Sequence, residues 1–297
     1  MSFAVFFDEP DSYRRNYDFY SLGGSPKLVA ELLKYLEINE GRLAQVFVAL
    51  YLYNNKAINE KLVWLSEKGV EINVFTMPIE GYDAGNPKDI IDIETRSVVG
   101  NGSKYELAKE IFTDHYRGRF KNFNLFFFPH MYLRSPKVKK FSRGNMPYSL
   151  HVKSFLFKHS NGQIDIATSS SNLAVRDLVK EENLIFVFDK AQYYQPALQF
   201  FHDLKRHCTL ISSFNFKAKH TSFEIAPANF ELNEHCGFMS PFYFDSSFRI
   251  EEYIREILSK AKQRIIIVGQ HVCPVDYKID GIFHSNASKM PERREGL

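Results

Sequence analysis

Apolar residues recur along the first quarter of the chain at alternating helix and strand spacings. Pro26 suits the first turn of a helix, and Gly41 follows the end of that helical pattern. The pattern predicts, in order, a helix over residues 28–38, a strand over 44–53, a helix over 54–68 and a strand over 70–76. Such a β-α-β unit predicts a parallel pair of strands joined by a right-handed crossover.

The remaining pattern predicts further elements of both kinds. Gly, Pro, Asn and Asp gather between Met77 and Ser103 and predict a long loop. Beyond it we expect a helix over 105–116, strands over 123–129, 149–157, 163–169 and 183–188, and a helix over 191–206. The sequence therefore predicts an α/β fold with a mixed, mostly parallel sheet flanked by helices on both faces.

Composition is that of an ordinary globular protein. The chain has 297 residues, of which 44% are hydrophobic and 25% charged. Its three cysteines (Cys208, Cys236 and Cys273) are too scattered for a disulfide framework and lack zinc-site spacing. We therefore expect no metal and no cofactor. No signal peptide and no apolar run of membrane-spanning length is visible, so we expect a cytoplasmic location.

The net charge of +3 is unevenly distributed. Residues 115–164 contain no Asp or Glu but ten Lys and Arg, among them Arg134, Lys137, Lys139, Lys140 and Arg143. Such a segment raises the local concentration of an anionic partner. Interleaved aromatic residues are typical of a track for single-stranded nucleic acid, although an anionic lipid surface would be attracted equally well, and a solvated loop is the plain alternative.

The strongest chemical signal lies in residues 148–183. His151 and Lys153 stand two apart in a run with strand character (SLHVKSFLF), so we expect both side chains on one face. After the turn signal Ser160-Asn161-Gly162, the strand QIDIATS leads to Ser170, Ser171 and Asn172. An imidazole, an ammonium group, an amide and hydroxyls gathered together suit phosphodiester chemistry without a metal.

His-x-Lys, followed some twenty residues later by Asn in a Ser-rich segment, resembles the phospholipase D superfamily. Glu182 stands just before the next strand, where that superfamily often has Glu. Lys158 occupies the position of the usual motif Asp, a departure shared with the tyrosyl-DNA phosphodiesterase branch. The resemblance implies a phospholipase D-like domain whose His attacks phosphorus to form a phosphohistidine.

The resemblance also implies roles for the matched residues. His151 would be the nucleophile, while Lys153 and Asn172 would hold the non-bridging phosphate oxygens. Ser170 is the family-matched hydroxyl, and Glu182 would orient an imidazole unless it is a surface charge at the start of a strand.

The superfamily mechanism needs two such half-sites, and this chain offers one. A homodimer or a missing C-terminal half would supply the second half-site. His130 and His159 are nearby along the chain, but neither has the partner Lys two residues on. Residues 246–272 repeat the helix-then-strand order of the N-terminal region, so we divide the chain into a phospholipase D-like domain (1–240) and the start of a truncated second repeat (241–297).

From these features we expect a metal-independent phosphodiesterase that acts on nucleic acid, as a nuclease or in DNA-end processing. The alternatives are a phospholipase or phosphatidyltransferase, and a non-catalytic phosphate-binding module, which the missing second half-site favours. The expected partners are therefore a phosphodiester substrate, DNA or RNA, and a second copy of the half-site.

Overall fold

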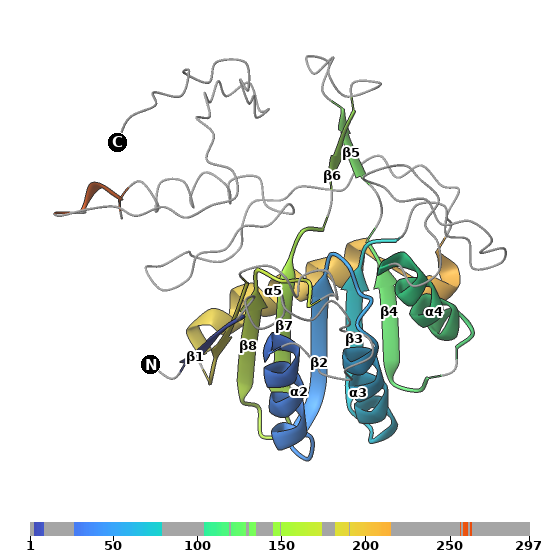
Figure 1. Cartoon of the computed structure of the whole chain (residues 1–297), viewed down its shortest axis with the longest axis horizontal. Helices are drawn as coiled ribbons and strands as arrows, with labels where there is room; N and C mark the ends of the chain where they lie inside the picture. Colours follow the sequence, from blue (N-terminus) through green and yellow to red (C-terminus); the bar gives the residue numbers. More distant parts are fainter. Residues whose placement is uncertain are drawn as a thin grey trace, which may run out of the picture.

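The computed structural model describes residues 3–8, 27–78, 104–118, 120–128, 131–134, 145–148, 150–173, 182–189 and 191–214, together with Glu256, residues 258–260 and Lys262 (Figure 1). The domain boundary predicted at residue 240 and nearly all of the predicted second repeat lie outside these residues, as does His130.

An eight-stranded mixed sheet forms the centre of the α/β fold (Figure 1). Its strands are β1 (Phe3–Phe7), β2 (Leu43–Leu50), β3 (Glu71–Thr76), β4 (Phe123–Phe127), β7 (Lys153–His159), β8 (Ile164–Ser169), β9 (Asn183–Val187) and β10 (Thr209–Leu210). Their order across the sheet is β1-β9-β8-β7-β2-β3-β4-β10.

In this sheet the parallel pairs are β2–β3 and β3–β4, and the other five pairs are antiparallel. The parallel pair predicted from the β-α-β unit is confirmed, but the prediction of a mostly parallel sheet is wrong. The helices at Lys56–Glu67 and Lys104–Tyr116 connect these parallel neighbours, as a parallel crossover requires. The turn at residues 160–163 is too short for a crossover, so β7 and β8 form a hairpin.

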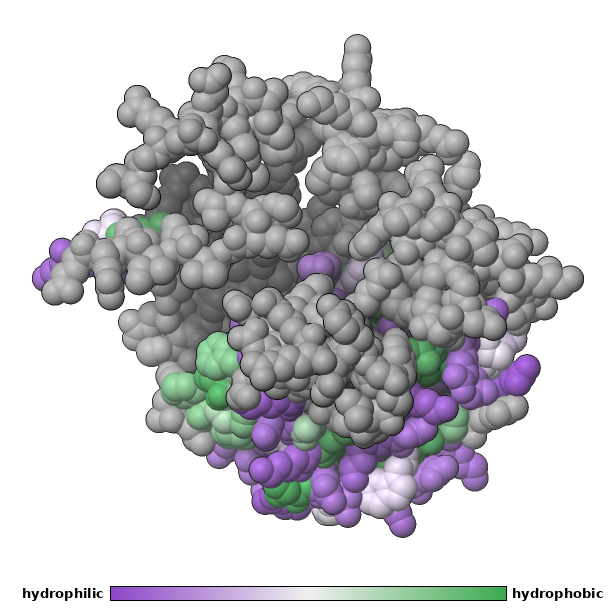
Figure 2. Space-filling view, viewed as in Figure 1, coloured by the Kyte–Doolittle hydropathy of each residue, from purple (hydrophilic) through white to green (hydrophobic). Residues whose placement is uncertain are grey.

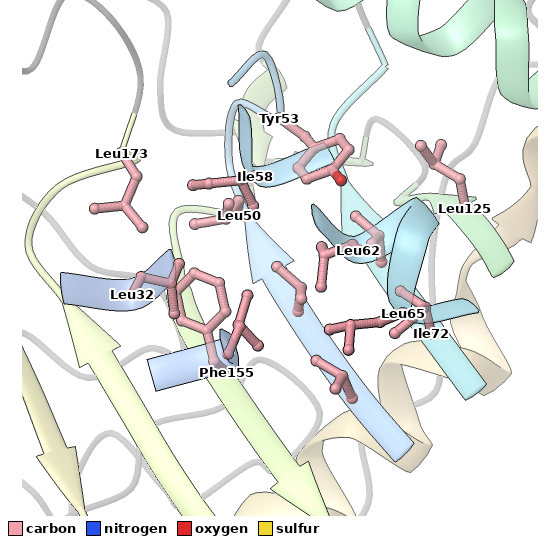
Figure 3. Close-up of a cluster of buried hydrophobic side chains, with 14 of the residues drawn as sticks. Leu32, Leu50, Tyr53, Ile58, Leu62, Leu65, Ile72, Leu125, Phe155 and Leu173 are labelled. Atoms are coloured by element: carbon pink, nitrogen blue, oxygen red, sulfur yellow. The ribbon is translucent and has the colours of Figure 1, made fainter. Parts of the chain in front are cut away.

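Helices α2 (Lys27–Asn39), α3 (Lys56–Glu67) and α4 (Lys104–Tyr116) pack on one face of the sheet, and α5 (Ala191–His207) packs on the other (Figure 1). Because neighbouring strand residues point to opposite faces, β2 serves both layers: Leu50 packs beneath the first three helices, and Ala49 packs towards α5. Figure 3 shows the first of these clusters, in which Leu62 and Leu65 of α3 lie over Ile72 of β3.

Two features were not predicted. β1 forms an edge of the sheet by pairing with β9, and its Phe3, Val5 and Phe7 are 57%, 38% and 61% exposed. Hydrophobic side chains gather on the surface at this edge (Figure 2). Between the strands predicted at 123–129 and 149–157, where no element was predicted, β5 (Met131–Arg134) and β6 (Asn145–Tyr148) form a separate two-stranded hairpin, which projects from the sheet (Figure 1).

None of the helices within the described ranges is both long and apolar enough to cross a bilayer.

Candidate active site

The predicted half-site lies where the parallel and antiparallel parts of the sheet meet. Lys153, the first residue of β7, pairs with Leu50, the last residue of β2. The site therefore sits beside the carboxyl ends of the parallel strands, the edge at which open α/β sheets generally bind ligands.

His151 lies just before β7, not within the strand as predicted. The chain is fixed on both sides of it: Leu150 is buried in the core cluster against α5, its N–H donates to Met77 Sδ at 3.3 Å, and Val152 packs against the same cluster. His151 itself is exposed. The sequence thus presents an imidazole to solvent between two apolar anchors.

Lys153 and His151 are in direct contact. The Lys153 ammonium Nζ lies 3.2 Å from Nε2 and 3.3 Å from Nδ1 of the imidazole, although the Lys153 side chain is largely buried. An ammonium group can only donate, so the ring nitrogen that carries no proton is the acceptor. The Tyr51 ring borders the pair, with its centroid 5.4 Å from that of His151 and a tilt of 57°.

The Ser-rich turn after β8 is held by its own hydroxyls. Ser169 donates to Asn183 O at 2.6 Å and accepts from the Ser171 N–H, while Ser171 Oγ accepts from the Leu173 N–H. Ser170 Oγ accepts from the Asn183 N–H at 2.9 Å. All three hydroxyls therefore shape the connection to β9, including that of Ser170, for which the resemblance implied a catalytic part.

Asn55 ties this turn to the loop after β2. Its side-chain nitrogen donates to Leu173 O at 2.8 Å, and its oxygen caps α3 by accepting from the Ile58 N–H at 3.1 Å. Leu173 is buried and adopts a left-handed backbone conformation (φ 54°), which turns the chain inward directly after Asn172. In Figure 3 Leu173 points towards the cluster that contains Leu50 and Ile58.

The register of the sheet brings the two parts of the half-site together. Ser154 pairs with Thr168, so one step further along this antiparallel pair Lys153 lies opposite Ser169. The structure therefore places the His-x-Lys segment and the SSSN turn at the same end of β7 and β8, as the motif requires.

Glu182 is further away. It precedes β9, its carbonyl accepts from the Asp8 N–H at 3.0 Å, and β9 is separated from β7 by β8. Two strand spacings amount to about 10 Å. A role for Glu182 in orienting the His151 imidazole stays a prediction.

The basic residues predicted to bind phosphate lie next to the half-site along the chain. Arg134 ends β5, where it pairs with Asn145 of β6, and β6 leads through residue 149 into the His151 segment. Lys137, Lys139, Lys140 and Arg143 lie outside the described residues.

His159 is not a second catalytic histidine of the same chain. It ends β7, about 20 Å from Lys153 at the rise of a strand. It is buried and its Nε2 lies 3.0 Å from Asp165 Oδ2, to which Tyr35 also donates at 2.7 Å.

This buried cluster has perturbed acidities. Burial alone would raise the pKa of Asp165, but hydrogen bonds from Tyr35, the Asp189 N–H, Gln163 and His159 hold it below its usual value. Burial raises the pKa of Tyr35 far above that of an exposed tyrosine. The cluster fastens the far end of the β7–β8 hairpin to α2.

Elsewhere in the described ranges, no three His, Cys, Asp or Glu side chains gather closely enough to hold a metal ion. Cys208 is buried, which raises the pKa of its thiol, whereas Cys236 and Cys273 lie outside the described residues.

No protein-family model and no curated protein matches the chain. Similar solved structures include NucT from Helicobacter pylori (12% identity, 70% of this chain and 99% of that one, TM-score 0.42). Another is the phospholipase D family member Nuc from Salmonella typhimurium (13% identity, 70% of this chain and 97% of that one, TM-score 0.41). A third is yeast tyrosyl-DNA phosphodiesterase (15% identity, 62% of this chain and 32% of that one, TM-score 0.28).

The chemistry open to this chain is set by its own residues.

Two residues of the site were missed by sequence reasoning: Tyr51, beside the imidazole, and Asn55, which joins the two loops. The position of Tyr51 directly after the apolar run of β2 was a usable signal, because side chains at the carboxyl end of a parallel strand border the ligand edge. The link from Asn55 to Leu173 crosses 118 residues and left no local signal.

Proposed function

We propose that the chain hydrolyses phosphodiesters without a metal ion, with His151 as the nucleophile. The observation that carries the proposal is the contact of the exposed His151 imidazole with the Lys153 ammonium at the ligand edge of the sheet. A nucleophile beside a fixed cation suits attack on a phosphate, whose non-bridging oxygens gain charge in the transition state.

The reaction has two displacements. A lone pair on a His151 ring nitrogen attacks phosphorus, the bond to the leaving oxygen breaks, and a general acid gives that oxygen a proton. Water then attacks the phosphohistidine, losing a proton to the same group, now a base; the phosphorus–nitrogen bond breaks and the imidazole is restored. Lys153 and Asn172 would bind the non-bridging oxygens in both steps.

We assign the general acid to a second half-site, because His159 is buried about 20 Å away and His130 lacks a Lys two residues on. Our proposal assigns it to the His151 of a second copy across a two-fold axis, where one surface meets itself and the two imidazoles face each other. A further stretch of chain that completes the second repeat predicted to start at residue 241 would be the other source.

We assign nucleic acid as the substrate because residues 115–164 contain ten Lys and Arg and no acid, and because this segment leads into the half-site. A phospholipid would satisfy the same chemistry. Binding to a single-stranded oligonucleotide, compared with binding to vesicles of anionic phospholipid, separates the two; preference for the vesicles would reject the nucleic-acid assignment.

The test is hydrolysis of bis(p-nitrophenyl) phosphate in EDTA, with the mass of the protein in solution measured alongside. We expect turnover from a dimer, and His151→Ala should lower kcat about a thousandfold or more with an unchanged melting temperature. His202→Ala is the matched control, because His202 is an exposed histidine on α5. Equal activity in His151→Ala and wild type would reject the nucleophile.

The observation of one half-site in the described residues favours a second candidate, a non-catalytic phosphate-binding module. A monomer that binds oligonucleotide, needs His151 and Lys153 for that binding and turns over no diester would identify the chain as such a module.

A further inference from the structure

Helices α3 and α4 enclose a groove on the face of the molecule formed by α2, α3 and α4. The groove has a volume of about 320 Å³, and its apolar lining includes Val63 and Trp64 of α3, Ile111 of α4, and Phe120. This face is turned to the viewer in Figure 2, where hydrophilic side chains predominate among the described residues and hydrophobic ones form smaller patches. None of the residues that line the groove belongs to the His151 half-site.

Carboxylates dominate the polar lining of the groove. The lining has four carboxylates, which are those of Glu60 and Glu67 on α3 and of Glu110 and Asp114 on α4. Its one lysine, Lys56, is paired with Glu110 at 3.5 Å, and of the two lysines beside Trp64, Lys61 is paired with Glu40 at 2.9 Å. The chain as a whole carries a net charge of +3, so this acidic lining is a local reversal of sign. A negatively charged groove attracts cations and repels phosphates.

Two ammonium groups of the chain itself already lie beside the aromatic wall. Lys61 Nζ lies 4.2 Å from the centroid of the Trp64 ring and Lys68 Nζ lies 5.4 Å from it. An occupant with aliphatic stems that end in positive charge would place the stems along the apolar floor and its charges among the carboxylates. An uncharged apolar occupant would instead desolvate those carboxylates without pairing them.

A buried polar chain holds the two walls in place. Tyr53 donates to Asn59 Oδ1 at 3.1 Å, and His115 Nε2 of α4 donates to the same oxygen of α3 at 3.0 Å. All three residues are at least nine-tenths buried. Because this contact fixes α3 against α4, the groove is formed before any occupant arrives, which lowers the entropic cost of binding.

From the apolar floor and the charge complementarity together, we infer that the α3–α4 groove is a docking site for a basic segment of a partner protein. The partner would present Lys or Arg side chains with apolar residues between them. At about 320 Å³ the groove lies at the small end of binding pockets and fits a few side chains of such a segment.

Trp64 makes the inference directly measurable, because it is the one tryptophan of the 297-residue chain. The probe is a synthetic 14-residue peptide rich in arginine and leucine, and its control replaces every arginine with glutamate. We expect the basic peptide to change the Trp64 emission saturably and the acidic peptide to leave it unchanged. An oligonucleotide should also leave it unchanged, so the result does not depend on the proposed phosphodiesterase.

The matched variants decide between docking and general charge attraction. Glu60→Gln/Glu67→Gln should weaken binding about fivefold, whereas Glu31→Gln/Glu37→Gln on α2 removes the same charge and should leave the affinity unchanged. Equal weakening by both pairs, or an equal response to the acidic peptide, would overturn the inference. A shift of Trp64 emission with protein concentration alone would replace the partner with a second copy of this chain.

Discussion

His115 should make the fold sensitive to mild acid. Its ring is buried at the end of α4, where it packs against Phe120 and Phe123 at centroid distances of 4.7 and 4.3 Å. This burial lowers the pKa of His115 from 6.5 to about 4. Lowering the pH from 7 therefore protonates the unfolded chain before the folded one.

The sign and the size follow from proton linkage. Because the folded pKa lies below the unfolded one, the unfolded state binds the extra proton between pH 6.5 and 4, and stability is lost as the pH falls through that window. At pH 4.5 the two pKa values give a loss of about 2.5 kcal/mol relative to pH 7. The pKa of Asp165 is held below its ordinary value of 3.8, so its protonation destabilises the fold mainly below pH 4.

Urea unfolding followed by Trp64 fluorescence at pH 7 and 4.5 measures this difference. His115→Gln keeps a donor for Asn59 but cannot titrate, so its loss between the two pH values should be smaller than that of wild type by about 2.5 kcal/mol. His202→Gln, at an exposed position, should behave as wild type. Equal pH dependence in wild type and His115→Gln would refute the assignment to His115.

Two further substitutions separate the site from the scaffold. Asn55→Ala removes the cap on the Ile58 N–H and the hydrogen bond to Leu173 O. It should lower the free energy of unfolding in urea by about 1–2 kcal/mol and slow diester hydrolysis. Unchanged turnover would contradict the link between Asn55 and the SSSN turn. Tyr35→Phe removes the hydroxyl that donates to buried Asp165 at 2.7 Å, so it should lower the free energy of unfolding by about 1–3 kcal/mol while kcat stays at the wild-type value. A fall in kcat comparable with that of Asn55→Ala would show that the two ends of the β7–β8 hairpin are coupled.

Local patterns predicted most elements of the fold. The spacing of α2 and α3 and the apolar runs of β2 and β3 gave both the element types and the parallel pairing. The prediction of a mostly parallel sheet was wrong because it extended the pairing of β2 and β3 to the later strands. A tight turn connects β7 to β8, and such a turn joins antiparallel strands. Strand β1 was not predicted, because five residues carry little periodicity and its partner β9 lies about 180 residues further along the chain.

The positions of the candidate residues along the chain were easier to predict than the contacts that they make. Residue types and spacing identified His151 and Lys153, and the structure brings them into contact even though His151 precedes the strand. The hydroxyl of Ser170 was assigned by resemblance alone, and no spacing could indicate that it accepts from Asn183. Contacts made across the sheet depend on register, which sequence separation does not encode.

The pairing of β1 with β9 has a consequence for the order in which the protein is made. Phe3 pairs with Val187, so at about 5–20 residues per second the ribosome takes roughly 10–40 s to supply the partner of a strand that emerged first. Through that interval the apolar run of residues 3–7 has no native strand to join. Cotranslational folding of this domain can therefore begin at β2, α3 and β3, but it closes only after β9 has left the ribosome.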